Sequence, residues 1–74
     1  MKRTSIIERR KDIALTQQEV AEKAGISRSY YAMIESGYKQ PTLKTWLRIG
    51  DAINLQRNEI FELIISSEEQ NNEQ

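Results

Sequence analysis

Two short helical segments joined by only three residues constrain this chain more than any other feature. Residues 17–24 and 28–36 both carry apolar side chains at helical spacing, and the link between them is Gly25-Ile26-Ser27. A link of this length forces the second helix to leave at a steep angle to the first, so the pattern predicts a helix-turn-helix. The alternative interpretation is an ordinary helical hairpin within a small bundle.

Capping residues stand at the ends of these two segments. Thr16 and Ser27 are suited to accept hydrogen bonds at the helix starts, and Glu19 is placed to complete a capping box with Thr16. Gly25 and Gly37 follow the segments, where a left-handed residue commonly ends a helix. The boundaries of both helices are therefore predicted by local signals.

The remainder of the chain shows the same pattern of short amphipathic helices, without strand or hairpin signals. We expect further helices over residues 4–14, 43–53 and 57–65. Thr42 is placed to cap the second of these. Five helices predict an all-α domain over residues 1–65. Residues 66–74 are rich in Glu, Gln and Asn and contain no apolar residue, so we expect an acidic, polar and disordered tail.

Composition excludes several classes of function. The 74 residues contain no cysteine and no histidine, which excludes disulfides, zinc fingers and most metal chemistry, so we expect no cofactor. The one adjacent pair of carboxylates, Glu68-Glu69, lies in the expected tail and cannot hold a catalytic geometry. We therefore expect that the protein is not an enzyme. No run approaches the roughly 18 apolar residues that cross a bilayer, so we expect a cytoplasmic protein without a membrane partner.

The net charge of zero conceals a strong separation of charge. Residues 1–50 contain 10 Lys or Arg and 5 Asp or Glu, whereas residues 51–74 contain 1 Arg and 6 Asp or Glu. The helix-turn-helix thus lies in the basic part of the chain, as expected for a nucleic-acid partner. Charges that merely solvate the surface are the alternative explanation.

A helical wheel divides residues 28–36 into two faces. Tyr31, Ile34 and Glu35 share one face. The opposite face carries a single charge among small or apolar neighbours: Arg28, Ser29, Ala32, Met33 and Ser36. An arginine can donate two hydrogen bonds to guanine, a serine can pair with several base edges, and alanine or methionine can contact a thymine methyl group. This face is therefore suited to the major groove of DNA.

Two charged residues point toward the expected core. Arg10 lies within the apolar arc of residues 4–14, and Glu35 lies beside Ile34. Because an unpaired buried charge is costly, we predict an ion pair between Arg10 and Glu35 that sets the orientation of the second helix. The alternative is that Arg10 extends past the core to solvent.

The stretches TQQEVAEKAGISRSYYAMIESG and KQPTLKTWLRIGDAINL resemble a known family. Over roughly Ile6 to Phe61, the chain resembles the DNA-binding domain of the lambdoid phage repressor and Cro family, also called the XRE-type family. The resemblance implies a compact five-helix fold like that of lambda repressor. It also implies a sequence-specific, double-stranded DNA-binding transcriptional regulator, with repression as its expected action. An antitoxin-like module that binds a partner protein through residues 57–74 is the alternative.

The resemblance further implies roles for individual residues. Four of them match base-reading positions: Arg28, Ser29, Ala32 and Met33. Eight match positions that hold the DNA backbone: Thr16, Gln17, Ser27, Ser36, Lys39, Gln40, Thr42 and Lys44. Arg10 and Glu35 match a charge pair that ties two helices together. Tyr30 departs from the family pattern, and it either reaches a DNA phosphate or packs on Ile34. Gly50 also departs, because relatives usually carry alanine there.

A single domain of this kind would contact only half of a DNA site, so we expect a homodimer on a palindromic operator. The candidate dimer surface is the last helix, which has more apolar residues than one short helix can bury: Ile60, Phe61, Ile64 and Ile65. The alternative is that these residues complete the core of the monomer. No segment indicates a small-molecule ligand.

Overall fold

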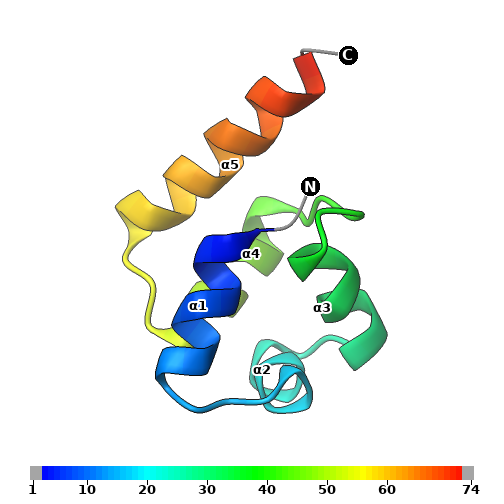
Figure 1. The fold of residues 1–74 in the computed structure, drawn as a ribbon, viewed down its shortest axis with the longest axis vertical. Helices are drawn as coiled ribbons and strands as arrows, with labels where there is room; N and C mark the ends of the chain where they lie inside the picture. Colours follow the sequence, from blue (N-terminus) through cyan, green and yellow to red (C-terminus); the bar gives the residue numbers. More distant parts are fainter. Residues whose placement is uncertain (1–2, 73–74) are drawn as a thin grey trace.

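Five α-helices make up the described part of the protein, which a computed structural model gives for residues 3–72, with side chains for residues 3–65. The helices are α1 (Thr4–Asp12), α2 (Gln17–Ala24), α3 (Arg28–Glu35), α4 (Leu43–Ile53) and α5 (Arg57–Asn72), as Figure 1 shows. No strand occurs within residues 3–72, so the predicted all-α fold is confirmed.

Side-chain caps start three of the helices as predicted. The hydroxyl groups of Thr16, Ser27 and Thr42 each accept a hydrogen bond from the backbone N–H three residues further on. Glu19 returns a bond to the backbone N–H of Thr16, which completes the predicted capping box. Gly25 ends α2 with a φ of 72°, a conformation that glycine adopts without steric cost. These local signals determine where α2 begins and ends and where α3 begins.

The end of α1 differs from the prediction, because the helix stops at Asp12 rather than at Ala14. Ala14 takes a left-handed φ of 59°. Its N–H bonds to the carbonyl of Lys11, and the next N–H, from Leu15, bonds to the carbonyl of Arg10. The Arg10 guanidinium also donates to the carbonyl of Leu15, at 2.9 Å. Backbone bonds and a side chain from the preceding turn therefore hold an alanine where glycine is usual.

The end of α5 also differs, because the helix begins at the expected Arg57 but continues past Ile65 to Asn72. Glu and Gln are good helix formers, and extending an existing helix is far easier than starting one. The side chains of residues 66–74 lie outside the described part of the structure. The division into a domain over 1–65 and a disordered polar tail therefore stays a prediction.

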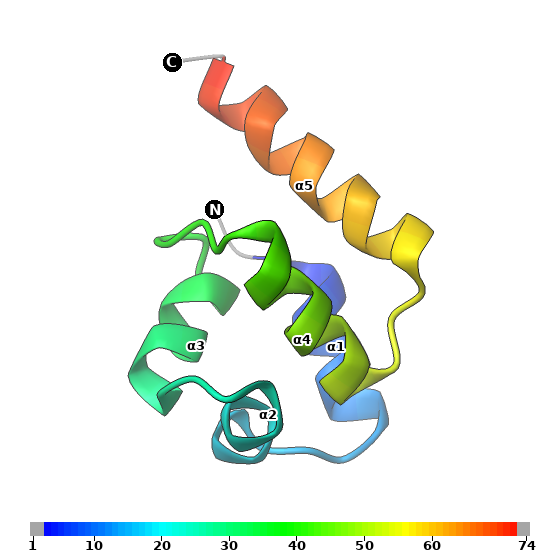
Figure 2. The ribbon, with the colours of Figure 1, turned by 180° about the vertical axis from the view of Figure 1, so that it is seen from behind.

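The helices surround one core. In both views of the ribbon, α2 is seen end-on below α3, and α5 lies on the opposite side of α1 and α4 from α3 (Figures 1 and 2). Helix α4 contacts α1, α2 and α5, and α3 contacts α1 and α2. The buried apolar residues are Ile6, Val20, Ala21, Ala24, Tyr31, Ile34, Trp46, Ile49, Ile53 and Ile60. The contact between α2 and α3 is part of this core, through Val20, Ala24, Tyr31 and Ile34.

Gly50 brings α5 close to α4 and corrects one expectation. Ile60 is only 2% exposed and belongs to the core, so it is a core residue rather than a candidate dimer residue. A Cβ atom at position 50 would overlap Cδ1 of Ile60 and lie 3.1 Å from its Cγ1. Because Gly50 has no side chain, the side chain of Ile60 can pack directly against α4 at this position.

Replacing Gly50 with alanine is expected to destabilise the protein by about 1–2 kcal/mol. Overpacking against Ile60 costs about 1–3 kcal/mol, and the better helix propensity of alanine returns up to about 1 kcal/mol. Adding Ile60→Val removes Cδ1 and should recover part of the loss, although Ile60→Val alone costs about 0.5–1.5 kcal/mol. Urea unfolding of the three variants measures this coupling. Purely additive losses would show that the two residues do not compete for space.

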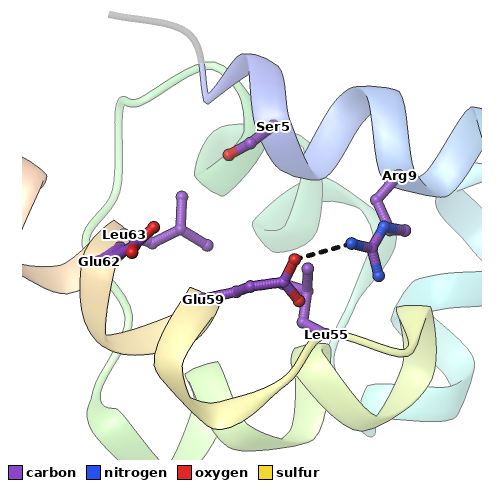
Figure 3. Close-up of a pocket in the computed structure, with 6 residues that line it drawn as sticks. All are labelled: Ser5, Arg9, Leu55, Glu59, Glu62 and Leu63. Atoms are coloured by element: carbon purple, nitrogen blue, oxygen red, sulfur yellow. Dashed lines mark hydrogen bonds and ion pairs between the residues drawn. The ribbon is translucent and has the colours of Figure 1, made fainter.

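An ion pair fastens α5 to α1 (Figure 3). Arg9 Nη2 lies 2.8 Å from Glu59 Oε1, and Arg9 Nη1 donates to the carbonyl of Asn54 at 2.7 Å. Figure 3 shows the Arg9 and Glu59 side chains among the residues that line a pocket between the two helices, together with Ser5, Leu55, Glu62 and Leu63. Arg9 therefore serves the fold on the side of α1 away from α3.

Candidate nucleic-acid interface

Helix α3 presents one buried face and one accessible face. Tyr31 and Ile34 are fully buried and Glu35 is 4% exposed. Of the residues predicted to read bases, Arg28 and Ser29 are exposed, while Ala32 and Met33 are half-buried. The four therefore lie on the surface of α3 that is not packed against α1 or α2, and only one of them carries a charge.

The carboxylate of Glu35 joins three helices at a single point. Arg10 Nε on α1 lies 2.6 Å from Glu35 Oε2, and Arg10 Nη2 donates to Glu35 Oε1 at 3.3 Å. Gln17 on α2 donates from Nε2 to the same Oε1 at 2.8 Å. The structure thus brings the predicted pair together and adds Gln17, which the sequence analysis placed at a DNA phosphate.

Protonation is disfavoured at this junction. Burial alone would raise the pKa of Glu35, but the hydrogen bonds from Arg10 and Gln17 outweigh it and hold the pKa below its ordinary value. Burial, and then the neighbouring carboxylate, raise the pKa of Tyr31, whose hydroxyl is enclosed without a well-formed hydrogen bond. The junction therefore holds a carboxylate, a guanidinium and a neutral phenol at neutral pH, and these fix the position of α3.

Arg3 is a positioning residue that the sequence analysis missed. Its Nη1 donates to the carbonyl of Ile34 at 2.6 Å, and its backbone N–H donates to the carbonyl of Glu35 at 2.8 Å. Its guanidinium lies 5.2 Å from the centre of the Trp46 ring, and its Nη2 donates to the side chain of Gln40. These partners are more than 30 residues away in sequence, so no local pattern could reveal them.

The residues predicted to hold the DNA backbone are distributed over two regions. Thr16 and Gln17 line one hollow together with Arg28, and Gln17 lines a neighbouring hollow with Ala32 and Ser36. The second region is the loop after α3 and the start of α4, which carries Lys39, Gln40, Thr42 and Lys44, all exposed. Neither hollow includes a residue of this second region.

Several of these polar groups already have partners within the protein. The hydroxyls of Thr16, Ser27 and Thr42 cap helices, and Ser36 Oγ donates to the carbonyl of Met33 at 2.9 Å. Lys39 Nζ lies 5.9 Å from the centre of the exposed Tyr38 ring. Tyr30 is half-buried and packs against the core, which agrees with one of its two predicted roles. Hydrogen bonds within the protein therefore hold several polar side chains of the candidate interface in place.

Comparison with known proteins identifies the family. Residues 6–60 match the family model described as helix-turn-helix. The chain belongs to this helix-turn-helix family. The match includes α2 and α3 and the junction formed by Arg10, Gln17 and Glu35. The predicted resemblance to XRE-type helix-turn-helix proteins is confirmed.

Relatives of this helix-turn-helix chain include regulators from a bacterium and a phage. The uncharacterized HTH-type transcriptional regulator YqaF of Bacillus subtilis (strain 168) is 32% identical over 71 residues, which cover 96% of this chain and 93% of that protein. The immunity repressor protein of Bacillus phage phi105 is 42% identical over 62 residues, which cover 81% of this chain and 43% of that protein.

A solved structure of a protein on DNA has a similar fold. The restriction-modification controller protein C.Esp1396I, bound to a 25 base pair operator site, matches with a TM-score of 0.70 and 25% identity. The match covers 86% of this chain and 84% of that protein. The fold of the present chain is thus shared with a protein whose structure has been solved in complex with operator DNA.

Two kinds of feature, metal-ligand groups and membrane-spanning helices, are absent from the part of this helix-turn-helix protein that the structure describes. No group of three or more His, Cys, Asp or Glu side chains within that part could hold a metal ion. Among its helices, none combines the length and the apolar content that a bilayer crossing requires.

Proposed function

We propose that the protein is a sequence-specific double-stranded DNA-binding transcriptional regulator, acting as a repressor rather than as an enzyme. One observation carries this proposal. On its inner face, α3 is held by the buried carboxylate of Glu35, which pairs with Arg10, and by the buried Tyr31. On its outer face it offers Arg28 and Ser29, both exposed. A rigid helix with few outward charges and one guanidinium is suited to enter the major groove.

The proposed mechanism assigns separate tasks to the two regions of the interface. Arg28, Ser29, Ala32 and Met33 would contact base edges, with the Arg28 guanidinium donating to O6 and N7 of a guanine. The start of α2, the loop after α3 and the start of α4 would contact phosphates on either side and set the register of α3. Glu35 orients α3 indirectly, because it binds Arg10 and Gln17 rather than DNA.

We also propose that two copies bind a palindromic operator. Phe61 and Ile65 on α5 are 51% and 54% exposed, and Ile64 is half-buried. Large apolar side chains exposed on one helix favour an interface between chains. Since α5 lies on the opposite side of α1 and α4 from α3, contact through α5 would leave both copies of α3 free.

Selection of bound fragments from a pool of random DNA duplexes tests this function. We expect an enriched palindromic sequence with half-sites separated by one helical turn, about 10 base pairs from centre to centre. A single unpaired half-site would refute the homodimer and leave sequence-specific binding intact. If no motif were enriched, the proposed function as a sequence-specific regulator would be refuted, and the antitoxin-like alternative would then be favoured.

A further inference from the structure

We infer that Lys11, in the last turn of α1, contacts a DNA phosphate and extends the interface to a third helix. The inference rests on the proposed DNA binding and concerns a residue that neither α2 nor α3 contains. The last turn of α1 carries three consecutive cations, Arg9, Arg10 and Lys11. Lys11 differs from the two arginines in its contacts with the rest of the protein.

The two arginines are occupied within the protein. Arg9 binds Glu59 and the carbonyl of Asn54, on the side of α1 that faces α5. Arg10 binds Glu35 and the carbonyl of Leu15. Lys11 is exposed, and it makes no ion pair or side-chain hydrogen bond with any residue between 3 and 65. It therefore has a charge available for an external anion.

The position of Lys11 relates this charge to the proposed DNA surface. Lys11 lines the hollow that contains Gln17 and Arg28, and it also lines the neighbouring hollow that contains Ala32 and Ser36. Arg10 lines both hollows as well, but Glu35 compensates its charge. Lys11 thus supplies an uncompensated cation at the edge of the base-reading face.

The chemistry of lysine favours a phosphate over a base as the partner. Its ammonium group is a compact, mobile point charge without the planar geometry that lets arginine pair with guanine. Phosphates flank every base that α3 could contact, and such contacts position the protein without reading sequence. A cation at this edge would therefore strengthen binding to any duplex in which α3 lies in the major groove.

The test compares two variants that remove the same charge from exposed residues, Lys11→Gln and Arg57→Gln. Arg57 begins α5, on the opposite side of α1 and α4 from α3, so it is the matched control. Fluorescence anisotropy gives the Kd of each full-length protein for the duplex selected from random DNA and for a scrambled duplex of equal composition. Salt between about 50 and 200 mM gives the slope of log Kd against log salt.

We expect Lys11→Gln to reduce that slope by about 0.9 per bound chain and to weaken binding about fivefold per chain at physiological salt, on both duplexes alike. Arg57→Gln should leave the slope unchanged. An unchanged slope for Lys11→Gln, or equal effects of the two variants, would overturn the role of Lys11. Neither result would contradict the proposed function as a DNA-binding regulator. If the wild-type protein did not distinguish the selected duplex from the scrambled one, the proposed function itself would fail.

Discussion

Replacing Glu35 with glutamine is expected to lower the free energy of unfolding by about 3–5 kcal/mol. Glutamine keeps the shape of the side chain but removes its charge, which leaves the guanidinium of Arg10 enclosed without a counter-charge. The total stability of a domain of this size is about 4–11 kcal/mol, so this one change would remove a large part of it. Urea unfolding followed by circular dichroism measures the loss.

A double variant, Arg10→Met with Glu35→Leu, is the control for this prediction. Removing both charges leaves no unpaired buried ion, so the double variant should lose much less stability than Glu35→Gln. Acid adds a second test. Because the pKa of Glu35 is lowered in the folded protein, its contribution is present at neutral pH and is lost as the pH falls below about 4.5. A double variant that loses as much stability as Glu35→Gln would contradict the account.

Replacing Arg28 with alanine is expected to weaken binding to the selected operator by about 1–3 kcal/mol per half-site, or roughly 5- to 150-fold. The loss should be much smaller on a scrambled duplex, because a base contact contributes to the specific complex only. Arg28 is exposed, so the variant should fold as the wild type does. Arg57→Ala removes an equal charge and serves as the control. Equal losses on both duplexes would show that Arg28 contacts phosphate rather than a base.

Sequence reasoning succeeded where structure depends on neighbours in the chain. The caps at Thr16, Ser27 and Thr42 use atoms three residues away, so composition and spacing were sufficient to locate the starts of α2, α3 and α4. The inward orientation of Arg10 and Glu35 followed from helical periodicity, and the structure places them 2.6 Å apart.

Sequence reasoning failed where structure depends on distant contacts. The role of Arg3 requires Ile34 and Gln40, and the burial of Ile60 requires the space left by Gly50. The end of α1 requires Ala14 in the left-handed conformation, which the Cβ atom of alanine disfavours. The apolar count of α5 did not reveal which side faces the core, so Ile60 was grouped with Phe61 and Ile65 although only the latter two are exposed.

The central claim is that the outer face of α3 reads bases in the major groove, and substitution of 7-deazaguanine for guanine in the selected operator tests it most directly. This analogue removes the N7 acceptor from the major groove and leaves base pairing and the minor groove unchanged. At the guanine that Arg28 contacts, the substitution should weaken binding of the wild-type protein and have no effect on the Arg28→Ala protein. Equal effects on the two proteins at every guanine would contradict the claim.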